Sequence, residues 1–283
     1  MSESNMKQLP RIAMLGVGSM GGAILAGLRA PGVSVDGDIA VTTRSAASAA
    51  RVSDTSGLDA QATELVPEAN REAVQGARVV ILAVKPWLIH DLLDEIAGSL
   101  EPDAIVVSVA AGVTSESMQA ILPRRIAVVR AMPNTPSLVG LGVTGIAAGT
   151  SASDADVAIV QEIFATVGQV LVVDESQINA VAAVSGSGPA YLYLYAEEMT
   201  AAAVRLGFDE AEARLLAEQT VVGAVELMRR SGETPAELRR RVTSPKGTTE
   251  QAILVMQEAH LGDVYDRALA ANIRRSQELE AGN

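Results

Sequence analysis

The sequence predicts a two-part α/β protein: a doubly wound, mainly parallel sheet in residues 1–174, followed by an all-helical region in residues 175–283. Short runs of β-branched residues alternate with helical patterns through the first part, which is the rhythm of strand–helix–strand units. Several runs, such as residues 79–84, are apolar at nearly every position, as is typical of strands covered on both faces. Beyond Asp174 the alternation stops and only helical signals follow.

Each element of the first part is predicted by its own composition. We expect strands at residues 11–16, 38–43, 78–84, 104–109, 125–130, 143–148 and 168–173. We expect helices at residues 20–29, 67–75, 86–100, 115–122 and 154–166. Apolar strands that alternate with helices in this way predict a parallel sheet with helices on both of its faces.

Helix-start signals divide the second part. Pro189 follows a Ser-Gly pair and suits the first turn of a helix. Asp209 can cap a long helix that runs to about Arg230. Thr234 is followed by proline and, three residues on, by glutamate, which is a capping-box pattern. We therefore expect a second, helical domain with its boundary near residue 174.

Composition excludes several classes of protein. The 283 residues are 48% apolar and include no cysteine, which provides for a buried core and excludes disulfides, Fe–S clusters and a thiol nucleophile. The two histidines, His90 and His260, lie far apart, so we expect no metal site. With 22 basic and 34 acidic residues the net charge is −12, which argues against nucleic acid and anionic membranes as partners.

Two long uncharged stretches, residues 131–153 and 178–196, are candidates for membrane spans. Proline and glycine interrupt both, so neither predicts a continuous apolar helix. Residues 1–10 are polar and do not resemble a signal peptide. We therefore expect a soluble, cytoplasmic protein.

A glycine-rich segment joins the first expected strand to the first expected helix. Its G-x-G-x-x-G pattern is formed by Gly16, Val17, Gly18, Ser19, Met20 and Gly21. The first glycine permits a tight turn, the second lets a pyrophosphate approach the backbone, and the third lets helix and strand pack closely. At the first strand–helix turn this pattern favours dinucleotide binding over a simple turn of the chain.

The end of the second expected strand indicates which dinucleotide is bound. An NAD enzyme usually has an acidic residue there, whereas this chain has Thr42-Thr43-Arg44-Ser45. The guanidinium of Arg44 and the hydroxyl of Ser45 suit a 2′-phosphate, so NADPH is favoured and NADH remains possible. The alternative is that Arg44 is an ordinary solvated residue.

Three further strand ends carry candidate residues for the nicotinamide side. They are Ala83-Val84-Lys85-Pro86, then Ala111 and Gly112, then Pro133 and Asn134. Open α/β sheets bind ligands at this edge. The alternatives are a solvated charge for Lys85 and a rigid turn for the proline-rich segment.

Two hydroxyl-rich loops lead into helices of the second part. One contains Ser185 and Ser187, and the other runs from Val242 to Glu250 with Ser244, Lys246, Gly247, Thr248 and Thr249. Such a loop at a helix N-terminus can bind a small carboxylate. Ordinary helix capping by serine and threonine is the alternative for either loop alone.

Taken together, these segments resemble the pyrroline-5-carboxylate reductase family. The segments are GVGSMGGAI, AVKP, AAGV, RAMPNTP, SGSGPAY and VTSPKGTTEQA, in the order and spacing of the family. The resemblance extends from about Arg11 to Leu279, and its last three segments are the most specific. It departs from the family at Lys246, where glycine is usual, and over residues 256–266, which fit the family pattern poorly.

The resemblance implies a Rossmann domain followed by a helical domain that interlocks with its partner in a homodimer. It implies that such dimers assemble further, commonly into decamers of five dimers. It also implies an active site that combines the cofactor of one subunit with the loop near residues 244–249 of the other. Asn70 matches a cofactor contact of the family.

The implied reaction is hydride transfer from NADPH to C5 of the cyclic imine carboxylate Δ1-pyrroline-5-carboxylate, giving L-proline. The resemblance assigns the ring nitrogen to the Thr249 hydroxyl and the carboxylate to Ser244, Gly247 and Thr248. From charge alone, Lys246 could attract the same carboxylate. We expect Ser187 to bind the substrate, and Lys85 to be a catalytic residue together with Thr249.

Two other functions remain open from sequence. One is a different NADP-dependent reductase of the same plan, such as a β-hydroxyacid dehydrogenase or a reductase of another imine. A β-hydroxyacid dehydrogenase needs a lysine base on the helix after the glycine-rich interdomain segment, and residues 189–206 contain no lysine. The other is a non-enzymatic NADP-binding regulatory protein, which would leave the hydroxyl-rich loop without a role.

Overall fold

A computed structural model describes residues 8–53 and 57–281 of the chain. The chain forms two compact units: unit 1 contains the residues up to Ser187 together with those from Asn272 onward, and unit 2 contains Gly188–Ala271. The change from alternating strands and helices to helices alone, which led us to expect a boundary near residue 174, follows the last strand, β10. Between that strand and unit 2, unit 1 continues through short helical turns.

Unit 1 is built on an eight-stranded sheet with the order β10-β9-β8-β7-β6-β2-β4-β5. Neighbouring strands are parallel except β8 and β9, which are antiparallel. The strands are β2 (Ile12–Leu15), β4 (Ile39–Thr43), β5 (Leu58–Ala62), β6 (Val79–Leu82), β7 (Ile105–Ser108), β8 (Ala127–Met132), β9 (Gly142–Ala148) and β10 (Gly168–Val172). The predicted doubly wound, mainly parallel sheet is therefore confirmed.

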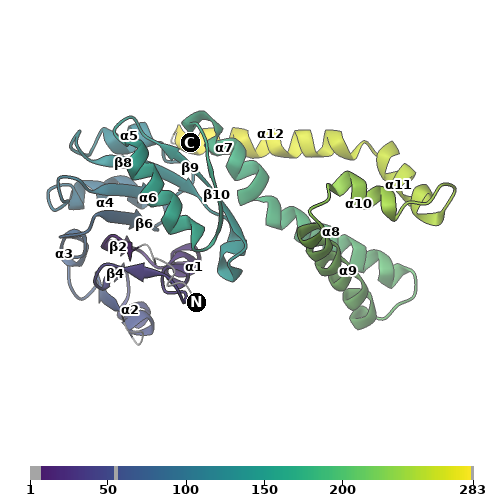
Figure 1. The fold of residues 1–283 in the computed structure, drawn as a ribbon, viewed down its shortest axis with the longest axis horizontal. Helices are drawn as coiled ribbons and strands as arrows, with labels where there is room; N and C mark the ends of the chain where they lie inside the picture. Colours follow the sequence, from purple (N-terminus) through teal and green to yellow (C-terminus); the bar gives the residue numbers. More distant parts are fainter. Residues whose placement is uncertain (1–7, 54–56, 282–283) are drawn as a thin grey trace, which may run out of the picture. The chain divides into compact units, whose positions relative to one another are not determined.

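Helices cover both faces of this sheet (Figure 1). Successive strand residues belong to opposite faces: Ile12 and Met14 join one buried apolar cluster, Ala13 and Leu15 the other. The first cluster includes residues of α1 (Ser19–Leu28) and α6 (Asp154–Ala165). The second includes residues of α3 (Ala69–Val74), α4 (Ile89–Ile96) and α5 (Ser115–Gln119). This explains why the central strands are apolar at nearly every position.

Several elements of unit 1 were not predicted from the sequence. They are α2 (Ala46–Ser53), the edge strand β5, and a two-stranded parallel sheet of β1 (Gln8–Leu9) and β3 (Ser34–Val35). The sequence of β5 lacks β-branched residues, and of its five residues only Ala62 is buried. An edge strand with one buried residue gives little hydrophobic signal.

After β10 the described chain contains only helical elements, as predicted. Unit 1 continues through η3 (Glu175–Gln177), α7 (Ile178–Val181) and η4 (Ala182–Gly186). Unit 2 contains α8 (Gly188–Arg205), α9 (Glu210–Ser231), α10 (Pro235–Arg241) and α11 (Thr248–Glu258). The predicted capping box of Thr234 is present, and Asp209 caps α9 as predicted, within a capping box that it forms with Glu212. The last helix, α12 (Leu261–Glu280), begins in unit 2, and its residues from Asn272 belong to unit 1.

No helix in the described part of the chain is both long enough and apolar enough to cross a bilayer.

Candidate active site

The glycine-rich turn lies between β2 and α1. Its backbone comes very close to Ala83, the residue that follows β6. Gly16 has a φ of +92°, and a Cβ there would lie 2.8 Å from the Ala83 carbonyl oxygen. A Cβ on Gly21 would lie 2.7 Å from the Gly16 carbonyl oxygen. Only glycine fits at these two positions, so the turn brings helix and strands together as the pattern predicts.

The same turn is open on the side where a ligand would approach. Around Gly18 a Cβ would meet nothing within 4 Å. Gly18 is also the N-cap of α1, and no side chain caps this helix. Because the first N–H groups of a helix attract anions when they are not capped, this end of α1 can bind a phosphate group.

A cavity of about 450 Å³ adjoins the turn. It lies near the switch point of the sheet, where β2 has β4 on one side and β6 on the other. Its lining residues are Gly16, Thr42, Thr43, Arg44, Thr63, Asn70, Val84, Leu88, Asp91, Leu92 and Glu95. Apolar and hydrogen-bonding groups together in one cleft suit a nucleoside.

Asn70 links the two walls of this cavity. Its Oδ1 accepts a hydrogen bond from the Thr42 hydroxyl at 2.7 Å, and its Nδ2 donates to the Glu95 carboxylate at 3.2 Å. A side chain bonded at both ends has a fixed orientation. The structure thus places Asn70, predicted through resemblance alone, in the same cavity as Arg44 and Gly16.

Arg44 lies where β4 ends and α2 begins, and its side chain is exposed. The first turn of α2 adds hydroxyl groups, since the Ser45 hydroxyl is within 3.1 Å of the Ser48 hydroxyl. The Arg51 guanidinium in turn donates to Ser48 at 3.1 Å. Two guanidinium groups and two hydroxyls in one short segment suit a phosphate ligand.

The other strand ends differ in how accessible their predicted residues are. Lys85 is exposed and precedes η1 (Pro86–Leu88), and Ala111 is exposed beside the half-buried Gly112. Pro133 and Asn134 are buried. The Asn134 amide accepts a hydrogen bond from the Val143 N–H at 2.9 Å and donates to the Ser185 carbonyl at 3.1 Å. Its side chain therefore joins two segments of unit 1.

The C-terminal part of α12 reaches two of the predicted segments. Asn272 donates to the Ser187 hydroxyl at 2.8 Å. A Cβ on Gly112 would lie 3.1 Å from Cβ of Leu279. Sequence reasoning did not find these neighbours, because no spacing pattern relates a C-terminal helix to loops more than eighty residues away.

A buried arginine fixes the end of α12 (the yellow C-terminal end in Figure 1). Arg130 on β8 is 4% exposed and pairs with Glu175 at 2.7 Å and Glu280 at 3.3 Å. Asn179 donates a further hydrogen bond to Glu280 at 3.0 Å. These bonds hold the helix end against the sheet of unit 1. Sequence reasoning treated Arg130 only as part of a motif.

The second group of predicted residues belongs to unit 2, in the loop before α11. The Gly247 N–H donates to the Ser244 carbonyl at 3.0 Å and closes a tight turn. Gly247 is the N-cap of α11, which has no side-chain cap, while Ser244, Thr248 and Thr249 are exposed. Uncapped N–H groups beside free hydroxyls can bind a carboxylate.

Lys246, the departure from the family pattern, adopts the left-handed conformation with a φ of 59°. Glycine adopts this conformation freely, whereas other residues do so at a cost. Its backbone N–H donates to the Glu250 carboxylate at 2.7 Å. The loop therefore has the backbone that glycine would favour, although lysine occupies the position.

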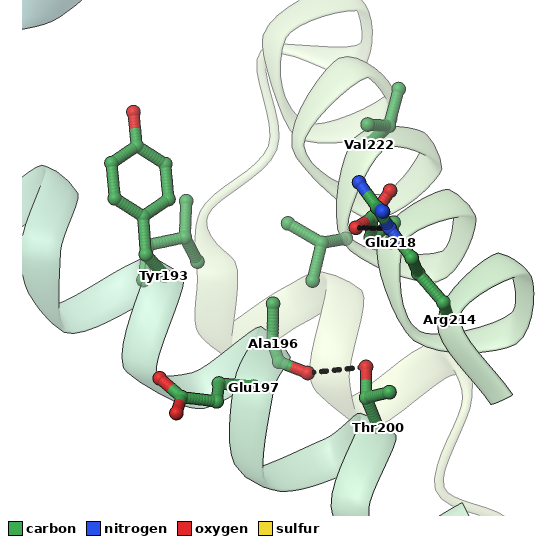
Figure 2. Close-up of a pocket in the computed structure, with 9 residues that line it drawn as sticks. Tyr193, Ala196, Glu197, Thr200, Arg214, Glu218 and Val222 are labelled. Carbon is green, nitrogen blue, oxygen red and sulfur yellow. Dashed lines mark hydrogen bonds and ion pairs between the residues drawn. The ribbon is translucent and has the colours of Figure 1, made fainter. Parts of the chain in front are cut away.

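Unit 2 also has a hollow of about 510 Å³ between α8 and α9 (Figure 2). Its lining is mostly apolar and includes Leu192, Val222 and the ring of Tyr193, which is 64% exposed. Arg214 and Glu218 form an ion pair of 2.6 Å at its edge. None of the predicted site residues lies in this hollow.

In residues 8–53 and 57–281, no group of three His, Asp or Glu side chains is placed to hold a metal ion.

These observations define a dinucleotide-binding protein with a helical second unit. A family model described as pyrroline-5-carboxylate reductase dimerisation matches residues 175–279, and one described as NADP oxidoreductase coenzyme F420-dependent matches residues 11–112. A pyrroline-5-carboxylate reductase of Pseudomonas aeruginosa is 41% identical over 271 residues, which are 95% of this chain and 97% of the relative. That of Escherichia coli is 37% identical, covering 95% and 98%.

Solved structures agree with these relatives. A pyrroline-5-carboxylate reductase of Coxiella burnetii matches with a TM-score of 0.86 and 38% identity, covering 95% of this chain and 98% of that one. The Plasmodium falciparum enzyme, solved with NADP bound, has the same fold at a TM-score of 0.79 and 23% identity, covering 95% and 98%. The chain belongs to the pyrroline-5-carboxylate reductase family, as the sequence motifs indicate.

Proposed function

We propose that the protein reduces Δ1-pyrroline-5-carboxylate to L-proline with NADPH, the last step of proline biosynthesis. The observation that carries this proposal is the 37–41% identity to reductases of that name over 95% of the chain. Two groups of residues support it: those that line a nucleotide-sized cavity, and the exposed hydroxyl residues at the uncapped N-terminus of α11. A biosynthetic role of this kind fits a cytoplasmic protein.

The residues of unit 1 fit the dinucleotide. Gly18 and the uncapped start of α1 would hold the pyrophosphate, Arg44 and Ser45 the 2′-phosphate, and Asn70 the adenosine. The other residues that we assign to cofactor binding are Gly16, Val17, Ser19, Met20, Gly21, Ala83, Val84, Lys85, Pro86, Ala111, Gly112, Pro133 and Asn134. When bound, NADPH supplies the hydride. For Asn134, whose amide is bonded within unit 1, we propose that the contact is made through its backbone or by positioning the loop.

The residues of unit 2 would bind the substrate. A protonated cyclic imine is already electrophilic, so positioning and electrostatics can supply most of the rate. We assign the carboxylate to Ser244, Lys246, Gly247 and Thr248. The Thr249 hydroxyl would hold the ring nitrogen, and Ser187 and Lys85 would complete the site.

We also propose that the chain acts as a homodimer in which the helical domain, residues 175–279 in the family model, forms the contact. By family membership, the loop of one subunit would serve the cofactor of the other, and dimers would assemble further into a decamer. The division into domains of residues 1–174 and 175–283 follows the start of the dimerisation model at residue 175.

The test is an NADPH-oxidation assay with pyrroline-5-carboxylate, its six-membered homologue, and NADH in place of NADPH. We expect turnover with the five-membered imine and a preference for NADPH. Thr249→Ala should lower kcat on the order of a hundredfold, because the hydrogen bond that positions the ring nitrogen is lost. The matched control is Thr220→Ala, because that hydroxyl only donates to the Leu216 carbonyl on α9.

Two results would contradict the proposal at different levels. Normal turnover in Thr249→Ala would remove the role given to Thr249. Failure to oxidise NADPH with either imine would overturn the reductase function and favour a regulatory NADP-binding protein.

A further inference from the structure

An acidic side chain occupies the N-terminus of α2, next to the segment that we assign to the 2′-phosphate. The Glu64 carboxylate accepts a hydrogen bond from the backbone N–H of Ala46, the first residue of α2, at 2.6 Å. Anions are favoured at helix N-termini because the N–H groups there carry partial positive charge. Glu64 thus takes the place that an anionic ligand of α2 would take.

The backbone holds Glu64 at this place. Strands β4 and β5 pair in parallel, and the pairing continues past their ends. The Thr63 N–H donates to the Thr43 carbonyl at 2.9 Å, and the Glu64 N–H donates to the Arg44 carbonyl at 3.2 Å. Because Glu64 and Arg44 are adjacent across this pairing, the carboxylate belongs to the same small region as the guanidinium.

This region is also the edge of the nucleotide-sized cavity. Thr43, Arg44 and Thr63 all line the cavity; Thr63 precedes Glu64 in the chain, and Arg44 accepts the hydrogen bond from the Glu64 N–H. A 2′-phosphate bound by Arg44 and Ser45 would need the positive end of α2 that Glu64 now uses. Since like charges repel, a carboxylate and a phosphate at this helix N-terminus would each be bound more weakly than either would be alone.

We propose that Glu64 is a specificity-determining residue that weakens the preference for NADPH over NADH. Its carboxylate acts as an internal anion that the 2′-phosphate of NADPH must displace. NADH carries a 2′-hydroxyl, which adds no charge and can donate to a carboxylate, so its binding leaves Glu64 in place. The inference concerns cofactor choice and rests on the proposed function only in taking NADPH and NADH as the ligands.

The experiment measures the dissociation constants of NADPH and NADH by isothermal titration calorimetry on the full chain. Glu64→Gln keeps an oxygen acceptor for the Ala46 N–H and removes the charge. We expect its Kd for NADPH to fall about fivefold to tenfold, the scale of one like-charge contact near a surface, and its Kd for NADH to stay within about twofold. The gain should shrink as salt is added.

The matched control is Glu72→Gln, which makes the same change of charge at an exposed position on α3 that does not line the cavity. It should leave both constants unchanged. Glu64→Ala, which also removes the acceptor of the Ala46 N–H, should likewise lower the Kd for NADPH. Thermal unfolding of each variant verifies that α2 remains folded.

Two results would overturn the inference. One is a ratio of the two constants in Glu64→Gln equal to that of the wild type. The other is a weaker affinity for NADPH in that variant, which would mean that Glu64 shapes the site rather than competes with the phosphate. If the Kd shifts as expected but the protein reduces neither imine, the reductase function alone would be overturned. A wild-type protein that binds neither dinucleotide would overturn both.

Discussion

The two units of the chain differ in how they bury their apolar residues. Unit 1 has an apolar cluster on each face of its sheet, with Leu15, Ile81 and Phe164 fully buried. In the described residues of unit 2 only Ala213 and Ala217 are buried, both on α9. Meanwhile Leu215 and Val255 are 66% exposed. Unit 1 therefore has its own core, whereas unit 2 has a large apolar surface and almost no core.

The two halves of the proposed site therefore depend on different interactions. The dinucleotide residues lie on a scaffold that is stable by its own burial of apolar surface. The substrate loop of residues 244–249 lies on helices whose exposed apolar surface needs a further surface to cover it. A family model of a dimerisation domain matches residues 175–279, in keeping with our proposal that a second copy of the chain covers these helices. We therefore expect substrate binding, more than cofactor binding, to depend on dimerisation.

The largest expected effect comes from placing a charge on the apolar surface of unit 2. Val222 is 59% exposed and lines the hollow between α8 and α9 (Figure 2). In a symmetric dimer, Val222→Glu would bury the carboxylate twice, at a cost of several kcal/mol. We expect the dimer to dissociate in light-scattering measurements and imine turnover to be lost.

The matched control for this change lies in unit 1. Leu65 is 69% exposed, so Leu65→Glu introduces the same charge on a unit that has its own core. It should leave the molar mass unchanged. A fully dimeric, active Val222→Glu protein would contradict the interpretation that a second copy covers this part of unit 2.

The next largest effect concerns the buried ion pairs of unit 1. Arg130→Met would leave Glu175 and Glu280 without their cation inside unit 1. Removing one partner of such a cluster costs on the order of 3 kcal/mol, which urea unfolding can measure. Arg229→Met is the matched change in unit 2, where the guanidinium is 59% exposed and pairs with Glu226. It should have a much smaller effect, because water solvates both charges. Equal losses in the two variants would contradict the difference between the units.

The parts of the fold that the sequence predicts are those with local signals. The buried strands are recognisable because both of their faces are apolar. The capping box of Thr234 is recognisable because its two residues are three apart in sequence. Strand β5 buries only Ala62 and has no such signal. The return of α12 to unit 1 depends on Glu280 and Arg130, which are 150 residues apart in sequence.

The candidate site divides in the same way. The glycine turn and the loop before α11 are continuous motifs, so the sequence predicts them together with their ligands. The Glu64 carboxylate reaches Ala46 across 18 residues, and Asn272 reaches Ser187 across 85. Such contacts follow from the pairing of strands and the path of helices. A single sequence does not contain that information in any local pattern.

Acid should weaken the two units to different extents. Burial, the largest influence on Asp156, raises its pKa, but hydrogen bonds from Ser153 and Arg78 together lower it. A carboxyl whose pKa is lower in the folded state adds stability above its unfolded pKa, and this stability is lost as pH falls through the folded pKa. Asp156→Asn should therefore cost about 1 kcal/mol at pH 7, the usual value of a helix cap, and less as the pH falls below 4.

The corresponding carboxyl in unit 2 is Glu226. Hydrogen bonds from Arg229 and Arg230 lower its pKa to about 2. The stability that the ionised Glu226 adds is therefore lost only as the pH falls from about 4.5 to about 2. Because the group is exposed, Glu226→Gln should change urea unfolding less than Asp156→Asn does at pH 7. A larger effect for Glu226→Gln would reverse the order that burial predicts.

The smallest expected effect is at Lys246, where backbone conformation and charge can be separated. Its φ of 59° is costly for any residue with a Cβ, so Lys246→Gly should be more stable than Lys246→Ala by about 1 kcal/mol. Both variants lack the charge. If Lys246 attracts the substrate carboxylate, both should raise KM equally, whereas a normal KM in Lys246→Gly alone would mean that only the backbone matters. The loop lies in unit 2, which has almost no core. We therefore expect the backbone preferences of its own residues, rather than packing against other residues, to determine its conformation.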